Sequence, residues 1–370
     1  MSDTIRVLIV GCGVVGATIA YELSRSPQFV VTVVEARSPA QGSTGAALGV
    51  LMGAISQKVK GRAWNLRQDS LHRYETLIPE LEAITGQSIP YNRQGIVLLR
   101  LEEESDPDRW TRLAAIRAQQ GWQIDLWDAH ELHRHCPQVA PWVPAVYSPG
   151  DRQIDPTALT LALVQAATQN GATFHFNCAM SPLPKAHEAD PTQLERCDRI
   201  VTVAGEIETD WLILTSGIGT SQLTQATPQP LDIRPVLGQA MRIRLADSLG
   251  DPTFQPVMTG NDIHLVPLVH GEYWVGATVE FANQEDAIAA QPNKLEEVWQ
   301  GAIAIWPNLA SATRLQTWYG LRPRPFNRPA PVIENFPGYT NVITATGHYR
   351  NGVLLAPATA AQVQQLILSR

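Results

Sequence analysis

A glycine-rich stretch near the amino terminus constrains the fold more than any other part of the chain. Residues 5–35 have the sequence IRVLIVGCGVVGATIAYELSRSPQFVVTVVE, with an apolar run before the spacing Gly11-x-Gly13-x-x-Gly16. A helix-like segment, a second apolar run and Glu35 follow. This order predicts a strand, a tight turn, a helix and a second strand, the unit that opens a nucleotide-binding α/β domain.

Each glycine of this spacing has a physical role in binding a dinucleotide. Gly11 allows the tight turn, Gly13 lets the backbone approach a pyrophosphate, and Gly16 lets the helix pack close to the strand. The helix start offers unpaired N–H groups and a partial positive charge to the phosphates. Glu35 is placed to bond ribose hydroxyls. A turn that only packs is the alternative, and the motif alone does not separate FAD from NAD.

Length, charge and cysteine usage narrow the class of protein. The 370 residues suffice for two domains, and the net charge of -7 disfavours broad nucleic-acid binding. The four cysteines lie far apart, with no CxxC or metal-ligand spacing, which suits a reducing compartment. Glu22 interrupts the first apolar stretch too early for a membrane span. We expect a cytoplasmic protein without a bound metal, a nucleic-acid partner or a membrane span.

A second small-residue segment, residues 43–50 with the sequence STGAALGV, follows the fingerprint. Residues this small allow close approach to a ligand, and the hydroxyls of Ser43 and Thr44 can bond phosphate or ribose. The alternative is a helix packed tightly on the sheet. We favour the cofactor interpretation because the segment comes directly after a dinucleotide motif.

The middle of the chain alternates between helical and strand-like patterns. Residues 61–85 follow a helical period, in which Pro79 is expected to cause a kink or a new turn. Residues 211–215 form a buried apolar strand followed by Ser216 and Gly217, where an open α/β sheet places ligand contacts. Three later runs, 238–245, 263–267 and 273–278, alternate as one antiparallel sheet would, and we expect that sheet to cover the substrate.

The carboxyl-terminal part repeats the order of strand, loop and helix start. Residues 342–346 predict a strand, 347–352 a loop, and the residues from Val353 onward a helix. A second helix start aimed into the same crevice could stabilise negative charge on a reduced cofactor. Arg322 precedes this unit in an apolar and aromatic setting, WYGLRP.

Taken together, these motifs resemble the D-amino-acid oxidase family of FAD-dependent oxidoreductases, and within it the glycine oxidases. The resemblance covers nearly the whole chain, and it rests on GCGVVG with Glu35, STGAALGVL, RPVLGQ, YWVGAT, YGLRP and TGHYRNGVLLAPATA. The last of these, residues 346–360, is the most specific and favours FAD over NAD.

The resemblance implies an α/β fold, α+β overall, with a Rossmann-like FAD-binding domain and a second, substrate domain built on an antiparallel sheet. It places the discontinuous FAD-binding domain at 1–90, 150–225 and 315–370, and the substrate-binding domain at 91–149 and 226–314. A homo-oligomer is implied by analogy only.

The cofactor-binding residues that we expect, from the family's motifs and from the strand end at 216–217, run along the chain. They are Gly11, Gly13, Val14, Val15, Gly16, Glu35, Ala36, Arg37, Ser43, Thr44, Leu48, Gly49, Val50, Met180, Ser216, Gly217, His348, Tyr349, Arg350, Asn351, Gly352, Val353 and Leu354.

Three residues are the catalytic candidates. Arg322 matches the arginine that binds the substrate carboxylate, and Arg350 lies beside it. His264 stands in an HLVP segment where glycine oxidases have a tyrosine that helps to position substrate. The alternatives are an Arg322 paired within the protein, an Arg350 that only holds its loop, and a His264 satisfied within its strand. Val279, where the closest relatives have a methionine, is a second departure that leaves the substrate open.

The implied activity is oxidation of the amine of glycine or a small amino acid, with hydride transfer to flavin. The imine product would hydrolyse to a 2-oxo acid and ammonia, and dioxygen or another acceptor would reoxidise the flavin. The alternatives are a D-amino-acid or secondary-amine dehydrogenase of the same family, an NAD-linked dehydrogenase, and a flavin-binding protein without turnover.

Overall fold

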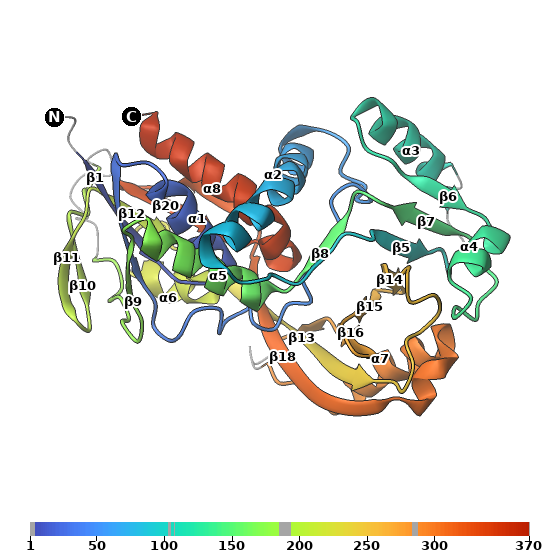
Figure 1. The fold of residues 1–370 in the computed structure, drawn as a ribbon. Coiled ribbons are helices and arrows are strands. Elements are labelled where there is room, and N and C mark those ends of the chain that lie inside the picture. The colour runs from blue at the N-terminus through green and yellow to red at the C-terminus, as the bar shows by residue number, and fades with distance from the viewer. Residues whose placement is uncertain (1–3, 103–104, 107, 185–193, 283–287, 370) are drawn as a thin grey trace.

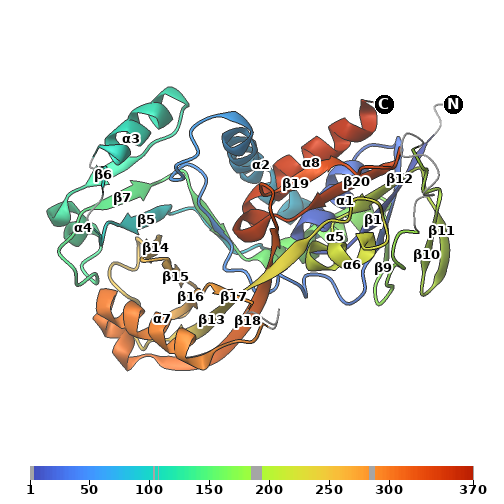
Figure 2. The same ribbon diagram turned by 180° about the vertical axis from the view of Figure 1, so that it is seen from behind.

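The computed structural model describes residues 4–102, 105–106, 108–184, 194–282 and 288–369. The chain forms two lobes, each built on a large β-sheet (Figures 1 and 2). The first sheet has the strand order β19-β20-β12-β1-β2-β9. Its strands, in chain order, are β1 (Ile5–Val10), β2 (Phe29–Val34), β9 (Thr173–His175), β12 (Trp211–Leu214), β19 (Val332–Asn335) and β20 (Val342–Thr346).

The strands of this sheet from β20 to β9 are parallel, and β19 is antiparallel at one edge. Side chains from alternate positions of β1 enter two different cores, Ile9 on one face and Leu8 on the other. Burial on both faces explains why the sequence of β1 is a continuous apolar run rather than an alternating one.

Four long helices share the core that contains Ile9 (Figure 1). They are α1 (Val14–Ser24), α2 (Gly61–Thr85), α5 (Pro156–Gln169) and α8 (Gly352–Leu368). The short α6 (Thr220–Thr224) contributes Leu223 to the core on the opposite face. The first lobe is therefore a sheet between two helical or loop layers, as its fingerprint predicts.

The second lobe holds a nine-stranded sheet with the order β17-β13-β16-β15-β14-β5-β7-β6, in which β18 also pairs with β13. The predicted antiparallel arrangement of residues 238–245, 263–267 and 273–278 is confirmed, because β13, β16 and β15 are antiparallel neighbours. The strands are β5 (Ile96–Leu99), β6 (Asp125–Trp127), β7 (Ala145–Ser148), β13 (Ile233–Arg244), β14 (Val257–Gly260), β15 (Ile263–Pro267), β16 (Glu272–Gly276), β17 (Glu280–Phe281) and β18 (Thr313–Pro325).

Smaller elements complete the two lobes. The helices of the second lobe are α3 (Arg109–Gln119), α4 (Ala129–His135) and α7 (Pro292–Ile305). A three-stranded sheet joins β3 (Val50–Leu51), β8 (Arg152–Ile154) and β4 (Tyr91–Asn92), and a separate hairpin joins β10 (Arg199–Thr202) and β11 (Gly205–Glu208). Three 3-10 turns are η1 (Gly217–Gly219), η2 (Pro307–Ser311) and η3 (Tyr349–Asn351).

The sequence predicts several element boundaries well. The helix expected over 61–85 is α2, although it continues as one helix through Pro79 rather than starting a new turn there. Because β18 pairs with β13 along its length, residues 315–325 belong to the second sheet by hydrogen bonding. The division of the chain into domains stays a proposal. Within the described residues, every helix is too short or too polar to cross a bilayer.

A pair of buried charges holds the segment that follows β3. The carboxylate of Asp151 is fully buried and accepts hydrogen bonds from the backbone N–H groups of Gly53, Ala54 and Ile55 at 2.7–2.8 Å. The guanidinium of Arg117, also fully buried, donates to the carbonyl oxygens of Ala54, Ser56 and Lys58 at 2.6–2.9 Å. The two side chains therefore fix residues 53–58 through backbone groups alone.

We predict that Asp151→Asn destabilises the protein by about 3 kcal/mol, because an uncharged amide replaces a buried carboxylate that satisfies three N–H donors. Urea unfolding followed by circular dichroism measures this loss. The exposed Asp69 on α2 supplies the matched control, Asp69→Asn. Equal stability of the two variants would contradict the role given to Asp151.

Candidate functional site

The carboxyl ends of the parallel strands gather the fingerprint residues at one edge of the first sheet. Gly11, Glu35 and Gly347 directly follow β1, β2 and β20. Ser216 is the second residue after β12. These four strands are neighbours in the order β20-β12-β1-β2 and run in the same direction. Ligands of open α/β sheets bind at this edge.

The glycines of the fingerprint occupy positions that no other residue could take without movement. Gly11 has φ +108°, and a Cβ there would lie 2.9 Å from the carbonyl oxygen of Thr215. A Cβ on Gly16 would lie 2.0 Å from the carbonyl oxygen of Gly11. The turn and the close packing of α1 on the strand, both expected from the sequence, are therefore present.

Two helices begin at this edge without side-chain caps of their own. Neither α1 nor α8 has a hydrogen bond from the side chain of its own N-cap residue or an acidic residue in its first turn, although Thr44 accepts from the Val14 N–H of α1. The helices pack against each other, and each follows a parallel strand, so both starts lie at the same edge. Uncapped N–H groups and two aligned helix dipoles give this edge a positive potential suited to pyrophosphate.

The carboxylate of Glu35 is oriented by backbone donors on either side. Its oxygens accept hydrogen bonds from the N–H groups of Cys12 at 2.7 Å and Arg37 at 2.9 Å. A carboxylate has about four acceptor positions, so it keeps capacity for ribose hydroxyls. Met180 packs near this end of β2, against the core cluster that contains Val34.

The buried hydroxyl of Ser216 is a further indication that a ligand binds at this edge. Its Oγ is buried, and among the described residues it has no hydrogen-bond partner. Buried hydroxyl groups are rarely left unpaired, because each costs free energy in the apolar interior. Together with the glycine turn and the uncapped helix starts, this orphan hydroxyl fits the binding of a dinucleotide at this edge.

Residues 43–50 connect this edge to the second lobe. They form turns leading into β3 rather than the helix considered as an alternative. The Oγ1 of Thr44 accepts the hydrogen bond of the Val14 N–H at 3.0 Å, at the start of α1. The Oγ of Ser43 donates to the carbonyl of Leu321 on β18 at 2.6 Å. Adjacent hydroxyls thus link the fingerprint helix to the strand that carries Arg322.

One face of the second sheet carries both Arg322 and His264. The register pairs His264 with Gly276, Gly276 with Ala240, and Gly238 with Gly320. Cross-strand partners and residues two apart on a strand project from the same face. Between His264 on β15 and the guanidinium of Arg322 over Gly238, the residues on this face are therefore Gly276, Ala240 and Gly238.

The same face lies against residues 43–50. A Cβ on Gly320 would lie 2.3 Å from the Cβ of Ala46, and one on Gly276 would lie 3.3 Å from a methyl carbon of Leu48. The Nε1 of Trp318 donates to the carbonyl of Ala46 at 3.1 Å. The small residues on this face let the predicted cofactor-binding segment approach the backbone of the sheet.

The guanidinium of Arg322 lies flat over the backbone of Gly238. A Cβ on Gly238 would come within 2.1–2.4 Å of three guanidinium atoms, and Nη1 donates to the Leu237 carbonyl at 3.1 Å. Among the described residues, no carboxylate forms an ion pair with Arg322. Burial, and after it the charge of Arg350, lowers the pKa of Arg322 from its ordinary value. An arginine nevertheless stays charged, so this half-buried cation has free donors.

The imidazole of His264 is neutral and has no hydrogen bond within the described residues. Its Nδ1 is buried without a partner. Burial lowers the pKa of His264 to about 4; Arg350 and Arg322 act in the same direction, and Asp262 opposes them. A neutral imidazole at physiological pH can accept or donate one hydrogen bond to a ligand on this face.

In the loop after β20, His348 is hydrogen-bonded within the protein, whereas Tyr349 has a strained backbone conformation. His348 is buried, and its Nε2 lies 2.9 Å from Oγ1 of Thr359. Since the Thr359 hydroxyl donates to the Leu355 carbonyl, the imidazole must donate to Thr359. Tyr349 has φ +54°, a left-handed conformation that a bulky residue rarely adopts. Such strained residues concentrate at functional sites.

Arg350 reaches across to the other lobe. Its Nη1 lies 3.5 Å from Oδ1 of Asp262, in the two-residue turn between β14 and β15. Asn261 and Asp262 both have positive φ, as in a type I′ hairpin turn. The contact is long and exposed, so it adds little to stability.

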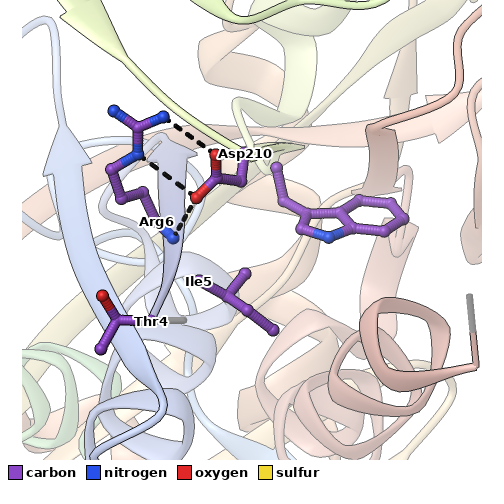
Figure 3. Close-up of a pocket in the computed structure, with 5 residues that line it drawn as sticks. Thr4, Ile5, Arg6 and Asp210 are labelled. Carbon is purple, nitrogen blue, oxygen red and sulfur yellow. Dashed lines mark hydrogen bonds and ion pairs between the residues drawn. The ribbon is translucent and has the colours of Figure 1, made fainter. Parts of the chain in front are cut away.

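A surface depression elsewhere on the first lobe is not a candidate site. It is lined by Thr4, Ile5, Arg6, Asp210 and Trp211 at the amino ends of β1 and β12, opposite the fingerprint edge (Figure 3). Its charges are already paired, since Arg6 binds Asp210 at 2.9 Å. The hydrogen bonds from Arg6 hold the pKa of Asp210 below its usual range.

The histidines of α4 have aromatic partners. His130 and His133 lie against Trp142, with ring centroids 4.9 Å and 4.5 Å away, and His135 stacks on Trp127 at 4.7 Å. Across the described part of the chain, no cluster of histidine, cysteine, aspartate or glutamate side chains has the arrangement of a metal site.

Four residues that shape the site are not among those predicted from the sequence. Gly238 and Gly276 lie within the motifs RPVLGQ and YWVGAT, and Arg324 and Asp262 lie outside the motifs quoted above. Small residues two apart on a strand, as in Gly238-Gln239-Ala240, were the signal available for the bare face of the sheet.

Comparison with known proteins identifies the family of the chain. The DAO family model, described as FAD dependent oxidoreductase, matches residues 6–366. The chain is 30% identical over 379 residues to the Bifunctional protein ThiO/ThiG of Synechocystis sp., covering 100% of the chain and 52% of that protein. It is 25% identical over 365 residues to Glycine oxidase of Bacillus licheniformis, covering 98% and 92%.

Among solved structures, glycine oxidase from Geobacillus kaustophilus is similar, with a TM-score of 0.84 and 24% identity. The match covers 99% of this chain and 96% of that one, and it shows the shared fold. The chain spans about half the length of the ThiO/ThiG relatives that it matches.

We predict that the buried His348 makes the protein less stable in mild acid. Burial lowers the pKa of this group to about 3, so between the unfolded value of 6.5 and pH 3 only the unfolded chain binds the proton. From pH 7 to pH 5 this costs about 2 kcal/mol of unfolding free energy.

His348→Gln, whose Nε2 can still donate to Thr359, should reduce that pH dependence by about the same 2 kcal/mol in urea unfolding at the two pH values. His175→Gln, at an exposed position on β9, serves as the control. An unchanged pH dependence in His348→Gln would show that this imidazole is not neutral in the folded protein.

Proposed function

The chain belongs to the DAO family of FAD-dependent oxidoreductases, with FAD as its cofactor, and from that premise we propose that it oxidises the amine of glycine or a small amino acid. The amine and α-carbon together lose two electrons and two protons, which gives an imine. Water then converts the imine to a 2-oxo acid and ammonia. FAD, when bound, supplies the hydride acceptor, and dioxygen or another oxidant takes the electrons from it.

The unpaired guanidinium of Arg322 is the observation that carries this proposal. A half-buried cation without a carboxylate partner is costly in a folded protein, unless a ligand supplies the missing charge. Its planar donors match a carboxylate in a bidentate geometry. The stacking on Gly238 restricts the plane of the guanidinium, so a bound carboxylate would be held in a defined orientation.

The neutral imidazole of His264 is suited to bind the amine of an amino-acid substrate. Oxidation requires the amine in its uncharged form, so that the nitrogen lone pair assists loss of the α-hydrogen. A neutral histidine on the same sheet face as Arg322 can accept a hydrogen bond from the amine. A cationic histidine would repel an ammonium group, and burial prevents that charge at physiological pH.

The residues proposed for FAD are those at the fingerprint edge. The starts of α1 and α8 would face the pyrophosphate and the flavin, Glu35 the ribose, and residues 43–50 the space between the two sheets. Arg350 and the loop at 348–354 complete the proposed set. Substrates of the same family, D-amino acids or secondary amines, are the second candidates, because the residues on the strands between His264 and Arg322 include the small Gly276, Ala240 and Gly238.

The proposal is tested by an anaerobic bleaching screen on the purified, FAD-loaded protein. Glycine, small D-amino acids and N-methyl amines are added singly, and the absorbance of oxidised flavin is followed. We expect at least one small amino acid to bleach the flavin and to give its 2-oxo acid in equal amount. A yellow protein that no amine reduces would instead support a flavin-binding role without turnover.

We predict that Arg322→Met raises the KM of the amino-acid substrate by about 100-fold, because two charge-assisted hydrogen bonds are lost. FAD should stay bound, since the proposed cofactor contacts lie on other residues. Arg314→Met provides the control, because Arg314 lies on the same strand but is exposed and paired with Glu296. A KM within twofold of the unchanged protein would remove Arg322 from the carboxylate site.

A second variant tests the contact between Arg322 and Gly238 by changing the glycine. Gly238→Ala places a methyl group where the guanidinium of Arg322 lies, so the arginine must move, and we expect KM to rise by about 10-fold. In the double variant Gly238→Ala/Arg322→Met, the glycine change should have no further effect on KM. Additive losses would mean that Gly238 acts independently of Arg322.

A further inference from the structure

Three arginines surround Tyr349 on the face of the second sheet that carries the proposed substrate site. Arg322 and Arg324 are two residues apart on β18 and so project from the same face. The Cζ atoms of Arg324 and Arg350 each lie 5.8 Å from the centre of the Tyr349 ring. We refer to Arg322, Arg324 and Arg350 as the arginine cluster.

The arginine cluster is poor in counter-charges. Within the described residues, neither Arg322 nor Arg324 has an ion pair, and Arg350 meets only Asp262, at 3.5 Å. Many other arginines have a closer carboxylate partner, as in Arg152 with Glu75 at 2.7 Å. The chain has a net charge of -7, so acidic residues are not in short supply.

The charge of the buried carboxylate of Glu280 acts on Arg322, but from the other face of the sheet. Glu280 pairs with Leu237 across β17 and β13, which places it on the opposite face of the sheet from Val236, the partner of Arg322. Its oxygens accept hydrogen bonds from Gln239 and from the backbone N–H of Gln291. Opposite Arg324, Arg234 is already paired with Asp232 at 3.0 Å. Among the described residues, the three cations of the cluster therefore meet one carboxylate on their own face, that of Asp262, which leaves two positive charges.

A buried acceptor near the cluster also lacks a partner. The Nδ1 of His264 is inaccessible to solvent and unbonded within the described residues. His264 projects from the same face of the sheet as Arg322, and Asp262, two residues before it, contacts Arg350. The cluster and the imidazole therefore belong to one site, which offers two positive charges and one neutral polar group to a ligand.

We propose that the substrate is a small amino acid or secondary amine that carries two acidic groups. One carboxylate binds Arg322, the amine lies near His264, and the second acidic group binds Arg350 and Arg324 beside Tyr349. A dianion balances the two positive charges, whereas glycine leaves one of them unpaired. This inference rests on the proposed function, because it names the class of amine that the same site oxidises.

The test compares substrates that differ only in the second acid, on the FAD-loaded protein without oxygen. Iminodiacetate is matched with sarcosine, and D-aspartate with D-asparagine. We expect the acidic member of at least one pair to reduce the flavin with a kcat/KM about 10-fold or more above that of its partner. In Arg350→Met the ratio should fall toward one, and in the control Arg314→Met it should stay as in the unchanged protein.

Binding without turnover supplies an independent measurement. Diglycolate and methoxyacetate are the ether counterparts of iminodiacetate and sarcosine and have no amine to oxidise. We expect diglycolate to bind about 10-fold more tightly by calorimetry, and to lose that advantage in Arg350→Met or Arg324→Met. Retained flavin absorbance and circular dichroism show that each variant is folded.

The outcomes separate this inference from the proposed function. If no amine bleaches the flavin but diglycolate binds preferentially, the activity is wrong and the dianion site stands. If sarcosine or glycine bleaches the flavin as well as iminodiacetate does, and diglycolate shows no advantage, the dianion site is overturned while the oxidase activity stands. If neither the acidic amines nor diglycolate is preferred and no amine reacts, both are wrong.

Discussion

The hydrogen bonds of two adjacent hydroxyls, those of Ser43 and Thr44, determine how the two lobes meet. Thr44 accepts from the first N–H of α1, and Ser43 donates to the strand that carries Arg322. A glycine turn can hold a phosphate without these contacts, but it cannot place the arginine for which we propose a substrate-binding role. Ser43 and Thr44 thus connect the start of α1, where we propose that phosphate binds, to β18, which carries Arg322. The rest of the site lies around this connection.

The face of the second sheet that lies against residues 43–50 is formed by small residues. Gly238, Ala240, Gly276 and Gly320 leave the backbone bare, so that residues 43–50 and the guanidinium of Arg322 can approach it. Glycine within a strand weakens the sheet, because it packs nothing and loses more conformational entropy on folding. This loss is offset by the long pairing of β13 with β18 and by the core on the other face of the sheet.

Buried charges serve two different purposes in this protein. Asp151 and Arg117 are saturated by backbone groups, so they fix residues 53–58 and have little capacity left for a ligand. Arg322 has no carboxylate partner in the described part of the chain, although its surroundings lower its pKa and disfavour its charge. Satisfied charges stabilise a conformation, whereas an unsatisfied one is stabilised only when a ligand of opposite charge binds.

The sequence by itself determined the local units: the strand-turn-helix around Gly11, the helix at 61–85, and the strand and helix at the carboxyl terminus. Steric limits on φ and hydrophobic periodicity act over a few residues, so they can be recognised in one chain. The family resemblance added FAD and the candidate Arg322. Only the folded structure shows that Gly238 lies under the guanidinium of Arg322, that Glu280 lies on the other face of the sheet, and that, among the described residues, the cluster around Tyr349 contacts a single carboxylate, that of Asp262. These facts depend on register and on contacts between residues far apart in sequence, which no local pattern encodes.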